Sequence, residues 1–119
     1  MSEEEEKTGM EHPVYDSFFI RSNNQLIRVR WNDIYWIHAD GNYSYIVTAE
    51  KRYAVKSSMK KLLSRLPLQH FLRIHKGYIV QIAYIEKVDT KDNIVTVGEH
   101  DLPLGRIYKE QLLEKLDII

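Results

Sequence analysis

Apolar and polar residues alternate along much of the chain, and a period of two residues is typical of half-buried β-strands. In residues 26–31, for example, Ile27, Val29 and Trp31 fall on one face and Arg28 and Arg30 on the other. Short runs rich in β-branched and aromatic residues predict further strands. These strands are expected at residues 18–21, 34–38, 43–48, 52–55, 71–74, 82–88 and 94–97. Turns are expected at residues 22–24, 39–42, 49–51, 90–93 and 98–101, and a loop or helical turn between residues 74 and 82.

A helical period replaces this alternation in two places. The first apolar stripe runs from Met59 to Leu66 at i, i+3, i+4 and i+7 spacing, and Pro67 ends it. One of the two serines before Met59 can cap this helix. A second stripe lies within residues 106–116. The pattern therefore predicts one helix between strands and one at the C-terminus.

Most of the chain is expected to be antiparallel β-structure in small sheets, because short polar turns join consecutive strands. A parallel arrangement would need more crossover helices than the pattern contains. Residues 1–16 have no periodicity and are expected to be a disordered acidic tail or linker. Residues 17–119 are expected to form a single domain.

The formal net charge of the 119 residues is zero, with 17 basic and 17 acidic side chains. Six of the acids and one base lie in residues 1–16, so residues 17–119 carry a net charge of +5. A mildly basic domain is compatible with a phosphate-backbone partner. The chain has no cysteine, which excludes disulfides and thiolate metal sites and suits the cytoplasm.

Neither a transmembrane span nor an enzyme is indicated. No run approaches the roughly 18 apolar residues of a membrane-spanning helix, so we expect a soluble cytoplasmic protein without membrane contact. Nucleophile, zinc-protease and glycine-rich phosphate motifs are absent from the sequence. Among the histidines, only His38 and His75 lie in strand-like segments, without a partner at metal-ligand spacing. We therefore expect no catalytic activity, no metal and no cofactor.

Residues 71–82 are the most informative stretch, because Arg73, His75 and Lys76 lie within four residues between apolar runs. Gly77 predicts a break there, which would place these donors at the rim of a rigid sheet. Arginine and lysine suit guanine, asparagine suits adenine, and phosphates accept from many polar side chains. Three segments offer such groups: Asn42 with Tyr43, His75 with Lys76, and Arg106 with Lys109.

Composition and spacing alone indicate a small β-rich binding domain, and other partners stay open at this point. A protein-interaction module that docks through exposed tyrosines is the main alternative, and an RNA-binding domain is a third. RNA binding would need aromatic side chains exposed on a sheet face. The alternation of Tyr43, Tyr45 and Tyr53 with Ile46 and Val47 instead favours core or half-core positions for the tyrosines.

Five blocks occur in order along the chain: DIYWI at 33–37, GNY at 41–43, VKSSMKKL at 55–62, FLRIHKGYIVQ at 71–81 and LPLGRIYK at 102–109. Together they resemble the LytTR-type DNA-binding domain, the output module of many bacterial two-component response regulators. The resemblance covers about residues 17–118. The block at 71–81 is the most specific, since it is similar to the family's F-x-R-V-H-R-S-Y-I-V-N.

The resemblance implies an elongated β-β-β arrangement that inserts loops into successive major grooves of duplex DNA. It implies a sequence-specific transcription regulator that reads tandem half-sites, with a pair of molecules on adjacent repeats. A sensor histidine kinase would act only indirectly, through a receiver domain that 16 leading residues cannot form. The implied DNA contacts are Asn42, Tyr43, His75, Lys76 and Arg106, with Lys109 on phosphate and Arg73 holding the loop.

The chain departs from the family pattern at four other positions. Gly77 and Gly105 stand where the family usually has serine, so two hydroxyls that would reach phosphate are missing. Gln81 replaces an asparagine, and His38 stands near a position that is often acidic. These changes leave the expected fold intact and bear on the DNA contacts.

Overall fold

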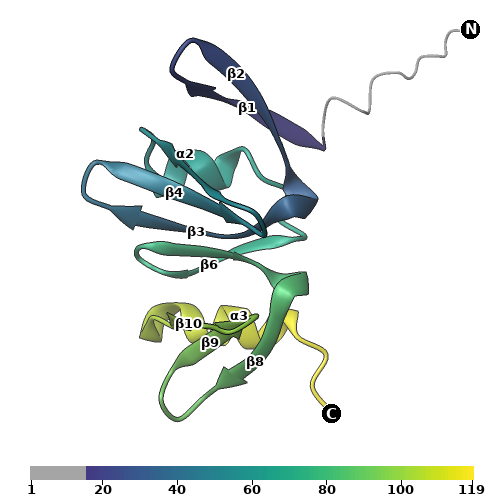
Figure 1. The fold of residues 1–119 in the computed structure, drawn as a ribbon. Helices are drawn as coiled ribbons and strands as arrows, with labels where there is room; N and C mark the ends of the chain where they lie inside the picture. Colours follow the sequence, from purple (N-terminus) through teal and green to yellow (C-terminus); the bar gives the residue numbers. More distant parts are fainter. Residues whose placement is uncertain (1–15) are drawn as a thin grey trace, which may run out of the picture.

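The computed structural model describes residues 16–119, and the predicted tail lies outside the described residues except for Asp16. In this range ten strands form three antiparallel sheets, accompanied by two short α-helices and three 3-10 turns (Figure 1). The molecule is elongated, with principal extents of 54, 39 and 24 Å. The predicted fold class is confirmed.

The first sheet is a hairpin of β1 (Ser17–Ser22) and β2 (Gln25–Arg30), at the top of Figure 1. Asn23 occupies its turn with φ of 56°, a left-handed conformation that asparagine tolerates better than most residues. A 3-10 turn, η2 (Trp31–Asp33), then leads into the central sheet.

The central sheet has five strands in the order β5-β4-β3-β7-β6. The chain forms one edge first, crosses over through a short helix, and completes the other edge by pairing β7 with β3. Ser58 caps that helix, because its hydroxyl accepts from the Lys61 amide at 3.1 Å, as the sequence predicted. The elements are β3 (Ile34–Asp40), β4 (Tyr43–Thr48), β5 (Arg52–Val55), α2 (Met59–Ser64), β6 (Phe71–His75) and β7 (Tyr78–Gln81).

The third sheet, in the order β10-β9-β8, lies on the far side of the central sheet from the first hairpin. A C-terminal helix packs against it and against β6. The remaining elements are η3 (Ile82–Tyr84), β8 (Ile85–Asp89), β9 (Ile94–Val97), β10 (His100–Pro103), η4 (Arg106–Tyr108) and α3 (Lys109–Lys115).

Two hydrophobic cores lie on opposite faces of the central sheet. One face, which includes Ile37 and Ile79, packs against the first hairpin and α2. The other face, which includes Trp36 and Val80, packs against the third sheet and α3. Consecutive residues of β3 and β7 are therefore both buried, as in a strand covered on two sides. Each fully buried large side chain contributes roughly 1.5–3 kcal/mol, so these strands hold the layers together.

Several predicted boundaries were wrong. Trp31 was expected to end the strand at residues 26–31 but begins the 3-10 turn η2. Tyr78–Gln81 was expected to be a loop or helical turn but forms β7, whose partner β3 lies about forty positions earlier in the chain. Residues 82–84 form a 3-10 turn instead of strand, because the chain passes there from the central sheet to the third. The turn expected at residues 98–101 is shorter, and His100–Pro103 pairs with β9 as β10. Only Leu102 of β10 is buried, so the strand has little apolar pattern.

No helix in the described part of the chain is long and apolar enough to cross a membrane.

Gln81 links the 3-10 turn η2 to the central sheet. Its side chain is 4% exposed, and its Nε2 donates to the carbonyls of Trp31 at 2.9 Å and Ile34 at 2.8 Å. Both amide hydrogens are therefore used to hold the connection between the first hairpin and β3.

We predict that Gln81→Met lowers the free energy of unfolding by about 1–3 kcal/mol, because one buried and one partly buried carbonyl lose a donor at nearly constant side-chain volume. Urea denaturation measures this change. Gln111→Met at an exposed position of α3 is the control and should stay within about 0.5 kcal/mol of the parent. Equal denaturation midpoints for Gln81→Met and the parent would contradict this structural role.

Candidate nucleic-acid interface

Three segments that are distant in sequence lie next to one another along one edge of the molecule, at the left of Figure 1. They are the β3–β4 turn, the β6–β7 turn and the segment that leads from β10 into η4. The Ala39 amide donates to the Gly77 carbonyl at 2.9 Å, which joins the first turn to the second. The Gly105 amide donates to the Ile74 carbonyl at 2.7 Å, which joins the second to the third. The structure thus brings the predicted site segments together.

The β6–β7 turn is held from within by its own side chains. The Arg73 guanidinium donates to the Lys76 carbonyl, and the Gly77 amide donates to His75 Nδ1 at 3.0 Å. Arg73 is half-buried, whereas the side chain of Lys76 is exposed. Arg73 therefore holds the turn in the DNA-free chain, and Lys76 remains available at its tip.

The hydrogen bond to His75 also decides which ring nitrogen can donate outward. Because Nδ1 accepts from Gly77, the hydrogen of the neutral imidazole is on Nε2. An N–H at that position can donate to guanine O6 or N7, or to a phosphate oxygen. The His75 ring meets Tyr78 edge-on, with 5.6 Å between the centroids, and this contact restrains its orientation.

The β3–β4 turn presents Asn42 and Tyr43 to solvent. Gly41 has φ of 63°, the left-handed conformation that a tight turn of this kind requires. Tyr43 is 46% exposed, so its expected core or half-core position was wrong, although Tyr45 and Tyr53 are half-buried as expected. Tyr43 is the first residue of β4, and the pairing of β4 with β5 begins only at the next residue, Ser44.

A shallow groove of about 350 Å³ continues from this turn toward the start of α2. Lys56, Ser57 and Ser58 line it together with Asn42 and Tyr43. Lys56 was not among the predicted site residues, although it lies two residues before the helix cap. A basic residue just ahead of a helix start was the signal that could have identified it.

The third segment carries Arg106 and Lys109, which differ in their surroundings. Arg106 is exposed. Lys109 is half-buried, and its ammonium donates to the Thr90 carbonyl, which ties the β8–β9 turn to the start of α3. One of the three N–H donors of Lys109 is therefore used within the protein. A Cβ at Gly105 would lie 2.9 Å from the Tyr108 ring, so η4 packs tightly here without a side chain.

His38 lies in β3, and its surroundings lower its pKa below the usual value of a histidine. Burial lowers its pKa, the Arg52 charge lowers it further, and Asp40 opposes these effects in part. Its Nδ1 accepts from Trp36 Nε1 at 3.0 Å, and its ring faces Tyr45 and Tyr78. This histidine therefore packs within the sheet in place of the acid that the family pattern often has there.

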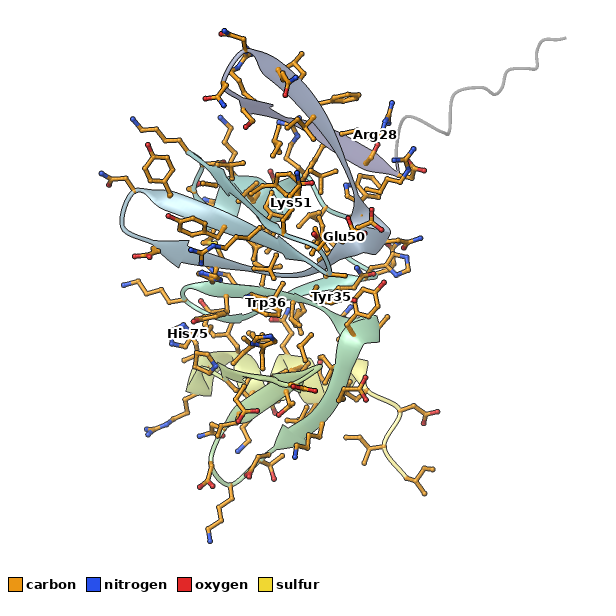
Figure 2. The ribbon with its side chains drawn as sticks, in the orientation of Figure 1. Arg28, Tyr35, Trp36, Glu50, Lys51 and His75 are labelled. Atoms are coloured by element: carbon orange, nitrogen blue, oxygen red, sulfur yellow. The ribbon has the colours of Figure 1, made fainter. Side chains whose placement is uncertain are left out.

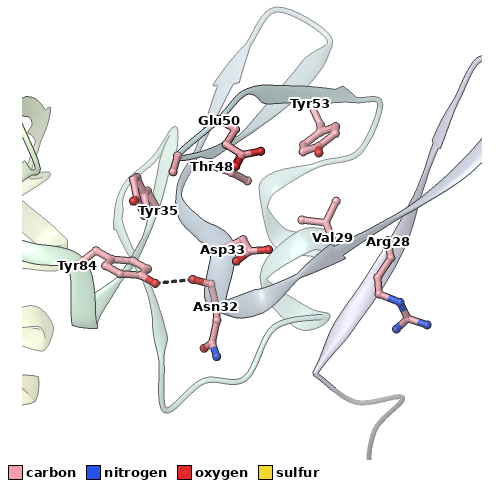
Figure 3. A pocket seen from close by; sticks show the side chains of 10 residues that line it. Arg28, Val29, Asn32, Asp33, Tyr35, Thr48, Glu50, Tyr53 and Tyr84 are labelled. Carbon is pink, nitrogen blue, oxygen red and sulfur yellow. Dashed lines mark hydrogen bonds between the residues drawn. The ribbon is translucent and has the colours of Figure 1, made fainter.

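The opposite edge of the molecule differs in the charges that it presents. Figure 2 shows Tyr35 and Glu50 on the side away from His75. A cavity of about 210 Å³ there is lined by three tyrosines, by the exposed carboxylates of Asp33 and Glu50, and by the exposed Arg28 (Figure 3). The two carboxylates outnumber this one guanidinium, so phosphate is better accommodated at the edge with Lys76 and Arg106. Within residues 16–119, no three acidic or histidine side chains are grouped so that they could hold a metal ion.

Residues 24–117 match the sequence model of the LytTr DNA-binding domain family. The chain belongs to this family. A LytTr DNA-binding domain of a methyl-accepting/DNA response regulator from Bacillus cereus has the same fold, with a TM-score of 0.75 and 19% identity. The similarity covers 87% of this chain and 98% of that domain.

Two longer proteins contain a segment similar to this LytTr domain. One is the heme-containing CO-sensing transcriptional regulator RcoM 1 of Paraburkholderia xenovorans, with 32% identity over 90% of this chain. The other is the sensory transduction protein LytT of Bacillus subtilis, with 22% identity over 78% of this chain. The chain spans about 40% of the length of each of these relatives.

We predict that Arg73→Ala loosens the β6–β7 turn of the LytTr domain before any DNA is bound. Loss of the bond to the Lys76 carbonyl should speed amide hydrogen exchange at residues 76–78 by about tenfold. Arg65→Ala removes an exposed arginine at the end of α2 and should leave this exchange unchanged. Unaltered exchange in Arg73→Ala would show that the guanidinium does not hold the turn.

Proposed function

We propose that this LytTr domain binds duplex DNA sequence-specifically as part of a bacterial transcriptional regulator in the cytoplasm. The observation that carries the proposal is the alignment of three polar turn segments along one edge. Hydrogen bonds between backbone groups hold these segments, so their side chains are positioned before DNA arrives. Preformed loops can enter a major groove without the entropic cost of ordering them.

Each predicted residue has a chemical role in this proposal. Lys76 and Arg106 are exposed donors suited to guanine, and Asn42 is suited to adenine. His75 offers its Nε2 hydrogen to a base or a phosphate. Tyr43, Lys56 and the remaining donors of Lys109 contact phosphate and fix the register. Arg73 supports these contacts by holding the turn that carries Lys76.

We further infer that two molecules bind adjacent half-sites of a tandem repeat. The input to the regulator comes from outside the domain. The names of its relatives describe one heme-containing, CO-sensing transcriptional regulator and one sensory transduction protein. In a two-component system the input would be a receiver domain, phosphorylated by a sensor histidine kinase. The domain itself contributes DNA recognition and no catalytic step.

We predict that Arg106→Ala and Lys76→Ala each weaken binding to a site selected from a random duplex pool. A lost base contact costs about 1–3 kcal/mol in binding free energy and relaxes the preference at one base position. Fluorescence anisotropy with matched and mismatched duplexes measures both effects. Lys115→Ala, an exposed change at the far end of α3, is the control. Unchanged affinity in Arg106→Ala would refute its assignment as a base-reading residue.

The main alternative is a protein-interaction module, which the exposed rings of Phe19 and Tyr43 favour. Salt dependence separates the two functions. The four cationic side chains Lys56, Lys76, Arg106 and Lys109 would each release about one counterion from DNA. DNA affinity should then fall by roughly a hundredfold between 50 and 200 mM salt, with a slope near 0.9 per charge. An interface made by aromatic side chains would lose far less. We predict the steep dependence for duplex DNA, and a flat one would support the alternative.

A further inference from the structure

Ile107 is an apolar side chain that the fold leaves almost fully in water. It is 85% exposed, more than any other large apolar residue of the described chain except the terminal Ile119. Its neighbours in sequence behave differently, because Leu104 is buried and Tyr108 packs against the second core. Nothing in the packing of the domain therefore accounts for an isoleucine at this position.

The backbone around Ile107 is rigid. It forms the middle of η4, where the Tyr108 amide donates to the Gly105 carbonyl at 3.0 Å. The Gly105 amide also donates a hydrogen bond to the carbonyl of Ile74, the residue before His75. A side chain at Gly105 would collide with the Tyr108 ring. Ile107 is thus held beside Arg106 at the proposed DNA edge, on a segment that cannot easily turn it inward.

The side chain of an exposed isoleucine has no hydrogen-bond donor, so it cannot bind a phosphate oxygen as its cationic and amide neighbours can. The major groove offers one apolar feature, the C5-methyl group of thymine, and side-chain methyl groups recognise it. We propose that Ile107 contacts the methyl group of a thymine next to the base that Arg106 reads. This inference rests on the proposed function, and it assigns sequence preference to a residue outside the predicted set of polar contacts.

Replacing thymine by deoxyuridine tests the proposal directly, because base pairing is retained and only the methyl group is removed. Each thymine of a selected binding site is replaced in turn, and affinity is measured for the parent and for Ile107→Ala. Burial of one methyl group corresponds to roughly a three- to fivefold change in Kd. One replacement should weaken the parent by that factor and leave Ile107→Ala unaffected.

Two further variants make the result specific. Ile107→Leu keeps an apolar side chain and should retain part of the thymine preference. Leu68→Ala removes another apolar side chain, 63% exposed, from the segment between α2 and β6, and it should retain the full preference. Since Ile107 and Leu68 are both largely in water, neither change should disturb folding.

Two outcomes would overturn the inference while leaving the proposed function in place. The parent would bind its selected duplex specifically, but either no single thymine would be sensitive to loss of its methyl group, or Ile107→Ala would keep the same sensitivity. A parent that bound selected and random duplexes equally well would instead overturn the proposed function, and this inference with it.

Discussion

The burial of the central strands on both faces is the constraint on which the structure depends. Ile37 and Ile79 face one core, and Trp36 and Val80 face the other. A register slip of one residue in β3 or β7 would exchange these sets and break the packing of both outer layers. Because the register cannot slip, the turns that end these strands are held in fixed positions, including the one that carries His75 and Lys76.

Four positive side chains at the proposed DNA edge are divided between two tasks. Arg73 and Lys109 donate to backbone carbonyls within the protein and hold turns in place. Lys76 and Arg106 are exposed beside them. At the opposite edge, the carboxylates of Asp33 and Glu50 border a cavity. A chain of zero formal net charge therefore has one edge suited to a polyanion, because the distribution of charge matters more than its sum.

Local patterns predicted much of the fold and less of the site. The alternation in residues 26–31 predicted the hairpin strand that the structure has at Gln25–Arg30, and the serine before Met59 caps its helix. The pattern failed at Tyr78–Gln81 because that strand is defined by pairing with β3, a partner distant in sequence. It failed for Tyr43 because alternation shows which way a residue points, whereas exposure depends on what covers that face.

The amino-acid sequence by itself determined the β-rich class, the positions of most strands and turns, and the five blocks that resemble the LytTr family. These properties depend on neighbouring residues, whose period and turn chemistry can be recognised locally. Only the tertiary structure decided that the segments near Asn42, Lys76 and Arg106 lie along one edge, that Arg73 holds a turn, and that Ile107 stays in water. Each of these depends on contacts between residues far apart in the chain, such as the bond from Gly105 to Ile74.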